Sequence, residues 1–332
     1  MPESVARAGM TRLSGVVAIL AFALIVVAGA DLRAGGTDGC AGWGDCSGWT
    51  HLSTTSGAIG RLHLAVAGVT GLATISLVAL SWLRLQDDRR VVRASIAALA
   101  LIGAQLGSVL LPGGGQAAIL GATTHLAATA LLLALALYLA TLPAIDRLRR
   151  SAIANTTNPG RERALVGWAV SVIFAVLVSG AFLTAADNAT TCAGWPLCGS
   201  HDVTSSSSLI TPDAHGLHRL FVAGAAGLLA VLGVQIVRAR GASRPRMAVV
   251  GSLIAIFTVE VVVGAFSASG ADGALVSATH FGAAGLSWSL LIILALVTNA
   301  EVAARPTIRT DRLPLHAIAR DYLRVMKPGI IV

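Results

Sequence analysis

Four histidines recur in this sequence as two pairs with the same internal spacing. His63 and His125 lie 62 residues apart, as do His218 and His280, and the second pair follows the first by 155 residues. Two imidazoles that face each other can hold a haem iron from both sides. A lone histidine in an apolar helix is more often a polar contact, whereas two matching pairs of ionisable groups indicate function. The spacing therefore predicts two haem-iron sites.

Two cysteine motifs repeat nearly in step with the histidines. They are Cys40-Ala-Gly-Trp-Gly-Asp-Cys46 and Cys192-Ala-Gly-Trp-Pro-Leu-Cys198, offset by 152 residues. Four cysteines allow three disulfide connectivities. The pairs Cys40–Cys46 and Cys192–Cys198 are the simplest, because each repeat then closes on itself. A zinc site is the alternative, although the CxxC spacing that is common among zinc ligands is missing.

The composition places these motifs in a membrane protein. Of 332 residues, 55% are hydrophobic and only 12% are charged, about half the charged share of a soluble domain. A membrane-spanning helix needs about 20 apolar residues. Runs of roughly that length cover residues 14–30, 59–83, 94–111, 117–142, 164–184, 215–237, 247–267 and 275–298. The sequence predicts an all-α integral membrane protein with eight transmembrane helices.

The basic charge is distributed as a membrane topology requires. All but three of the 24 Lys+Arg residues, namely Arg33, Arg61 and Arg219, fall in five segments that eight crossings bring to one side: 1–13, 84–93, 143–163, 238–246 and 299–332. Positive charge collects in cytoplasmic loops. We therefore expect a multi-pass protein of the cell membrane with both termini in the cytoplasm and no nucleic-acid partner. The cysteine motifs then face the oxidising outer side, where disulfides form.

The duplication divides the chain into four parts. We expect an N-terminal four-helix bundle at 14–142, a cytoplasmic linker at 143–163, a C-terminal bundle at 164–298 and a basic cytoplasmic tail at 299–332. Four crossings restore the starting side, so the two bundles are predicted to be pseudo-symmetric about an axis along the membrane normal. The paired histidines would lie at similar depth, on neighbouring helices.

Two arginines lie close to the paired histidines. Arg61 precedes His63 by two residues, and Arg219 directly follows His218. A guanidinium can bind a haem propionate through two parallel hydrogen bonds. Simple anchoring at the membrane interface is the alternative for both arginines.

These motifs resemble the haem A synthase family over residues 14–298. That family has eight helices in a duplicated four-helix bundle, with paired histidines in the second, fourth, sixth and eighth helices. The residues that carry the resemblance, besides the histidines, are Gly29-Ala-Asp-Leu-Arg33, Gly39-Cys40, Trp43, Cys46, Cys192, Trp195-Pro196, Cys198 and His218-Arg219.

The resemblance implies a function for each pair. The family oxidises the C8 methyl group of haem O to a formyl group, which gives haem A for cytochrome oxidase assembly. His63 and His125 would hold the substrate haem O as the catalytic pair. His218 and His280 would hold a permanent haem b that passes electrons, from a donor that the sequence does not identify. Haem O synthase and membrane lipid are the other expected partners.

One departure from the family concerns catalysis. Members commonly carry a glutamate three residues before the first histidine, and here that position is Gly60. No other acid falls within the predicted helices of the first bundle, since its first apolar run ends at residue 30. The alternative function is therefore a non-catalytic bis-histidine di-haem membrane protein that carries electrons or handles haem.

The C-terminal segment carries a second resemblance. Tyr322-Leu-Arg-Val-Met-Lys-Pro-Gly-Ile-Ile-Val332 is similar to the opening of protohaem IX farnesyltransferase, the enzyme that makes haem O. This similarity predicts that the chain is part of a fusion with that enzyme. An ordinary basic tail is the alternative.

Overall fold

The computed structural model describes residues 3–33, 55–109, 116–151, 159–186, 211–238, 244–269 and 273–303. Within these residues the chain forms eight helices, each long and apolar enough to cross a membrane. They are α1 (Glu3–Arg33), α2 (Thr55–Arg84), α3 (Arg89–Val109), α4 (Gln116–Ser151), α5 (Pro159–Ala185), α6 (Thr211–Arg238), α7 (Arg244–Ala268) and α8 (Ala274–Ala303). The predicted all-α fold with eight spans is confirmed.

The helices extend beyond the apolar runs at their ends. The first apolar run is 14–30, whereas α1 continues to Arg33, and α4 continues through Pro143 to Ser151. A helix satisfies its own backbone hydrogen bonds, so it need not stop where the side chains become polar. The expectation that no acid lies in the first bundle's helices was therefore wrong, because Asp31 belongs to α1.

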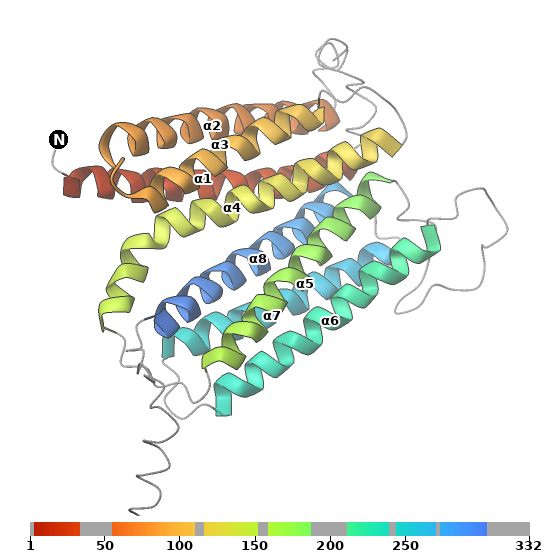
Figure 1. The fold of residues 1–332 in the computed structure, drawn as a ribbon. Coiled ribbons are helices and arrows are strands. Elements are labelled where there is room, and N and C mark those ends of the chain that lie inside the picture. The colour runs from red at the N-terminus through yellow and green to blue at the C-terminus, as the bar shows by residue number, and fades with distance from the viewer. Residues whose placement is uncertain are drawn as a thin grey trace, which may run out of the picture.

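The helices form two groups, α1–α4 and α5–α8 (Figure 1). In the first group α1 and α3 each contact both α2 and α4, and in the second α5 and α7 each contact both α6 and α8. The helices that carry the histidines, α2 with α4 and α6 with α8, therefore stand diagonally across their bundles. We had expected neighbouring helices. Diagonal helices place facing side chains across the centre of a bundle, where cofactor sites are built.

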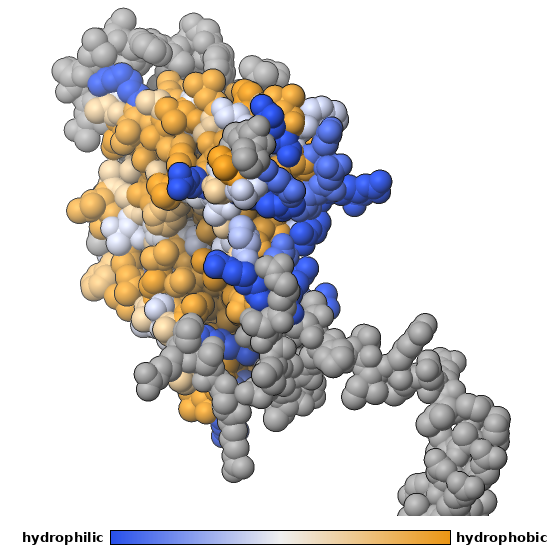
Figure 2. Space-filling view, turned by 90° about the vertical axis from the view of Figure 1, so that its left-hand side faces the viewer, coloured by the Kyte–Doolittle hydropathy of each residue, from blue (hydrophilic) through white to orange (hydrophobic). Residues whose placement is uncertain are grey.

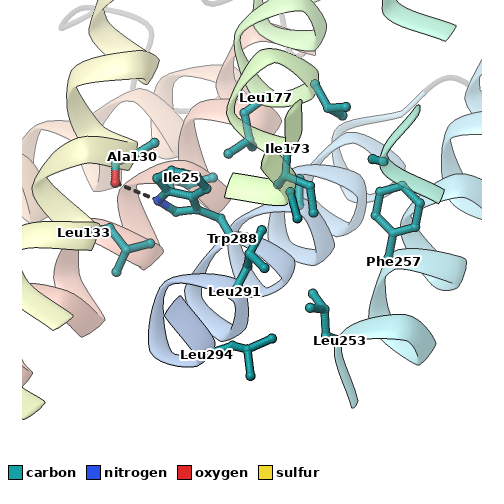
Figure 3. Packing of buried hydrophobic residues seen from close by; sticks show 14 of the residues in the cluster. Ile25, Ala130, Leu133, Ile173, Leu177, Leu253, Phe257, Trp288, Leu291 and Leu294 are labelled. Atoms are coloured by element: carbon teal, nitrogen blue, oxygen red, sulfur yellow. Dashed lines mark hydrogen bonds between the residues drawn. The ribbon is translucent and has the colours of Figure 1, made fainter. Parts of the chain in front are cut away.

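The two groups pack through α1 and α4 on one side and α5 and α8 on the other. Trp288 of α8 is buried there, and its indole Nε1 donates a hydrogen bond of 2.8 Å to the Ala130 carbonyl of α4 (Figure 3). Near the C-terminal end of α1, the Ser277 hydroxyl donates to the Gly29 carbonyl at 2.7 Å. A Cβ at Gly29 would lie 2.7 Å from the Phe281 ring, so α1 and α8 approach closely because position 29 lacks a side chain.

The outer surface is apolar along the helices. Large side chains such as Ile19, Leu83 and Leu275 are 71%, 71% and 80% exposed, and Figure 2 shows apolar residues over much of one face, with hydrophilic residues gathered beside them. Contiguous apolar surface of this kind marks contact with lipid or a partner. Polar side chains within the spans bond to their own helix, as Ser14, Thr70 and Ser95 do to the carbonyl four residues earlier. The chain is a multi-pass membrane protein.

Candidate functional site

The first histidine pair meets inside the N-terminal bundle. The rings of His63 on α2 and His125 on α4 have centroids 5.9 Å apart and planes 33° apart. A bond between a metal and an imidazole nitrogen is about 2 Å long, so two imidazoles on opposite sides of one iron have centroids about 6 Å apart. The pair therefore fits the axial ligation of a haem iron without a large movement of either helix.

The Nδ1 atoms of this pair are buried with little hydrogen bonding. Nδ1 of His63 and Nδ1 of His125 are both buried, and neither has a hydrogen-bond partner among the described residues. The Asp31 carboxylate of α1 lies near His63, with Oδ2 3.9 Å from Nδ1. The Gln105 backbone interacts with the His125 ring, so among the described residues it is His63 whose orientation no hydrogen bond fixes.

The second pair is held differently. His218 Nδ1 lies 2.9 Å from the Ser179 hydroxyl oxygen of α5, and this hydroxyl donates its own proton to the Ala175 carbonyl at 2.7 Å. With its proton on the carbonyl, the Ser179 oxygen is free to accept a hydrogen bond from His218 Nδ1–H. His280 Nδ1 lies 3.1 Å from the Glu260 backbone carbonyl of α7, which can only accept. Both rings carry their proton on Nδ1, which leaves Nε2 as the metal-binding atom.

Two glycines make room for the rings of the second pair. A Cβ at Gly180 of α5 would lie 3.2 Å from His218 Cε1, and a Cβ at Gly264 of α7 would lie 3.0 Å from His280 Cε1. Both distances are shorter than ordinary van der Waals contact. Each histidine thus packs against the backbone of an adjacent helix, which adds a steric constraint to the hydrogen bond.

No group of three or more His, Cys, Asp or Glu side chains that could hold a metal ion occurs in the part of the chain that the structure describes. A haem iron needs only axial ligands from the protein, because the porphyrin supplies the others. The two pairs therefore suit haem better than a bare metal ion. An apolar groove of about 540 Å³ on α3, α4 and α8 is lined by none of the four histidines.

Of the other predicted site residues, the structure describes the two arginines but not the four cysteines. Arg61 and Arg219 are half-buried on α2 and α6, close to His63 and His218. The four cysteines, Cys40, Cys46, Cys192 and Cys198, lie outside the described residues, so their pairing stays a prediction.

Sequence reasoning missed Asp31, Ser179 and Gly180, whereas Gly264 is one of the small residues expected to let helices approach closely. Ser179 has no counterpart in the repeat, because position 24, which is 155 residues earlier, is Leu24. Its role depends on a contact between α5 and α6 that no motif records. Asp31 was missed because its place depends on where α1 ends. For Gly180, the only signal was that it belongs to a chain rich in small residues.

The fold and these residues define a class: a helical membrane protein with one histidine pair in each of two four-helix groups. The model of the family COX15-CtaA, described as cytochrome oxidase assembly protein, matches residues 59–292. This match covers more than half of the chain, and the chain belongs to that family.

Relatives with another name also match. Protoheme IX farnesyltransferase of Halobacterium salinarum is 29% identical over 180 residues, which are 51% of this chain and 38% of that protein. The proteins of the same name from Haloarcula marismortui and Chloroflexus aurantiacus are 33% and 32% identical, over 48% and 45% of this chain and 38% and 26% of their own length. The chain thus spans well under half the length of these relatives.

The first of these alignments reaches well beyond the C-terminal tail. The alignment covers 51% of the 332 residues, about 169, and residues 305–332 number only 28, so at least about 140 aligned residues of this chain lie before position 305. The chain's similarity to these farnesyltransferases therefore lies mostly in the region of its helices.

Proposed function

We propose that this protein is a haem A synthase, which oxidises the C8 methyl group of haem O to a formyl group. The carrying observation is the His63–His125 pair, whose rings face each other at 5.9 Å inside the first bundle of a member of a cytochrome oxidase assembly family. Two axial imidazoles are a haem-binding arrangement. Conversion of a methyl to a formyl group adds one oxygen atom and removes two hydrogen atoms, so it is a four-electron oxidation.

The two pairs divide the work in this proposal. His218 and His280 hold haem b for electron transfer, and their Nδ1 hydrogen bonds to Ser179 and the Glu260 carbonyl support a rigid, permanent site. Outer partners of this kind orient a metal-binding histidine and raise its basicity. His63 and His125 hold haem O, the substrate that must enter and leave this site.

The residues and helices around the two sites have structural roles in this proposal. Arg61 and Arg219 bind haem propionates, and the outer cysteines form the disulfides Cys40–Cys46 and Cys192–Cys198. Residues 14–142 and 164–298 act as pseudo-symmetric bundles. The helix contacts support this, because the pairs in contact within α1–α4 recur within α5–α8. Both termini lie in the cytoplasm, as the distribution of Lys and Arg indicates.

Haem O synthase is the proposed partner. The relatives named protoheme IX farnesyltransferase resemble this chain over about half its length, which supports a physical link between the enzyme that makes haem O and the one that uses it. In this proposal the chain is the haem-oxidising portion of a fusion, or it works beside a separate synthase.

The second candidate is a non-catalytic di-haem protein. Gly60 favours it, because glycine offers no carboxylate at the position where the family commonly has glutamate. The two candidates differ in product, since only the synthase makes haem with a formyl group.

The first experiment expresses the chain in a host that supplies haem O, then extracts the haems and identifies them by liquid chromatography and mass spectrometry. We expect haem A or its hydroxylated intermediate. Haem B and unreacted haem O alone, from folded and reducible protein, would instead establish the non-catalytic candidate.

The histidine variants test the division of labour. His218→Ala and His280→Ala should abolish the stable haem b spectrum. His63→Ala and His125→Ala should retain that spectrum and abolish formyl-haem formation, because only the substrate pair is lost. Equal losses of haem b in all four variants would contradict separate roles.

A further inference from the structure

Asp31 places a carboxylate beside the first histidine pair. It lies in the last turn of α1 and faces His63 on α2, with Oδ2 3.9 Å from His63 Nδ1. The two side chains are only 24% and 18% exposed. At this distance the Asp31 carboxylate and the His63 ring form an ion pair only if the imidazole is protonated.

His63 Nδ1 requires such an acceptor. If Nε2 binds iron, Nδ1 must carry the ring proton, and this buried donor has no hydrogen-bond partner in the described part of the chain. A buried donor without an acceptor is costly, and metal-bound histidines almost always donate their second N–H to a carboxylate, a carbonyl or water. A rotation of the Asp31 side chain that moves Oδ2 by about 1 Å would bring it within the usual hydrogen-bond distance of His63 Nδ1.

In the second bundle, a side chain of the first helix already lies within hydrogen-bond distance of a histidine Nδ1 on the second helix. There Ser179, on the first helix of its group, accepts from Nδ1 of His218 on the second helix. Asp31 and His63 occupy the first and second helices of the other group. The contact therefore has the same topology in both halves, but the first half uses a charged acceptor instead of a hydroxyl.

Gly60 and Asp31 share one region of space. A Cβ built at Gly60 would lie 3.8 Å from Asp31 Oδ1, and no other atom outside its own stretch of helix lies within 4 Å. A side chain at position 60 would therefore extend toward the place where the Asp31 carboxylate lies. Helix α1 supplies an acid where α2 offers none.

We propose that Asp31 is a positioning residue that accepts a hydrogen bond from His63 Nδ1–H and increases the electron donation of this imidazole to the iron at the first pair. It takes the place of a carboxylate on α2. The inference rests on the proposed function for the identity of the haem at this pair. It predicts how tightly that haem is held and at what potential it is reduced.

The test is a potentiometric titration of the full-length, haem-loaded protein, followed by its visible spectrum. His63→Ala identifies the transition of the first site, because that transition disappears. In Asp31→Asn the same transition should move to higher potential, since a neutral acceptor donates less electron density to iron, and haem retention there should fall by about 10- to 100-fold. The transition of the second site should not move.

A second-site substitution provides the matched control. Gly60→Glu in the Asp31→Asn background should return the potential of the first site toward the wild-type value, because the new carboxylate reaches the same region. Gly60→Gln in that background, which has the same shape without charge, should not. An unchanged potential in folded Asp31→Asn overturns the inference, as does equal rescue by Gln.

The remaining outcomes are also decisive. If Asp31→Asn does not accumulate, Asp31→Glu must accumulate and hold the first haem, and failure of both variants would show a purely structural role. The result is independent of turnover. Wild-type protein that binds haem at both pairs but forms no formyl haem refutes the synthase function and leaves the shift in potential fully measurable.

Discussion

A histidine presents one nitrogen to a metal reliably only when something controls the other. At the second pair that control is visible, because Ser179 and the Glu260 carbonyl fix Nδ1 of His218 and His280. Glycine contributes as well as the polar partners. Gly264 allows the His280 ring to lie against α7, so ring position depends on a side chain that is absent.

Gly264→Ala should therefore impair haem binding at the second pair. The added Cβ would lie 3.0 Å from His280 Cε1, and the ring must shift by some tenths of an ångström, which disturbs both its hydrogen bond and its direction toward the iron. The reduced-minus-oxidised spectrum should lose much of the haem b signal. Gly251→Ala on the same helix, where nothing lies within 4 Å, should leave it unchanged.

Charged side chains near the ends of α1, α3 and α4 fix how these helices meet. Asp88 is the N-cap of α3, where its Oδ1 accepts from the Arg90 N–H at 3.2 Å. Its carboxylate also accepts hydrogen bonds from the Arg90 and Arg7 guanidinium groups. The Arg90 guanidinium donates a further hydrogen bond to the Asp146 carboxylate of α4. Burial acts to raise the pKa of Asp88, but the hydrogen bonds from Arg90 and Arg7 outweigh it and hold the pKa below its ordinary value of 3.8.

Asp88→Ala should lower the free energy of unfolding by about 1 kcal/mol, the usual contribution of an N-cap. Asp88→Asn keeps the cap but loses the charge, so its free energy of unfolding should lie between those of the wild type and Asp88→Ala. Because the folded pKa is depressed, the contribution of the charge is present above about pH 4 and is lost as the pH falls through the folded pKa. Thermal unfolding in detergent at several pH values measures it. A difference between wild type and Asp88→Asn that grows below pH 4 would contradict this assignment.

The whole molecule depends on close contact between its two groups of helices. Trp288 of α8 donates to the Ala130 carbonyl of α4, and Gly29 of α1 admits the Phe281 ring of α8. The latter contact lies two residues before Asp31, so the packing of the two halves also sets where the end of α1 presents its carboxylate to His63.

Gly29→Ala should destabilise the protein by about 1–3 kcal/mol, the usual cost of overpacking a filled core, because the new Cβ would lie 2.7 Å from two atoms of the Phe281 ring. Gly15→Ala on the same helix, with nothing within 4 Å, should be neutral or slightly stabilising because alanine favours helix. Thermal unfolding of the two variants in detergent provides the comparison. Equal stabilities would show that α1 and α8 can separate without loss.

The sequence by itself determined the number of helices and the residues with the potential to ligate iron. Hydrophobic runs of bilayer length depend only on local composition, so all eight spans could be predicted from them. The repeat of His63 and His125 as His218 and His280 required no structure, because duplication preserves spacing. The haem assigned to each pair remains a prediction.

Only the tertiary structure decided which side chains surround those histidines. Helix ends are set by caps and packing, not by hydropathy, and so Asp31 could not be placed beside His63 from the sequence. Ser179 contacts His218 from another helix, 39 residues earlier in the chain. Gly264 contacts His280 from another helix, 16 residues earlier. Such contacts leave no periodic trace in the sequence, because they depend on how neighbouring helices are rotated and on how closely their backbones approach.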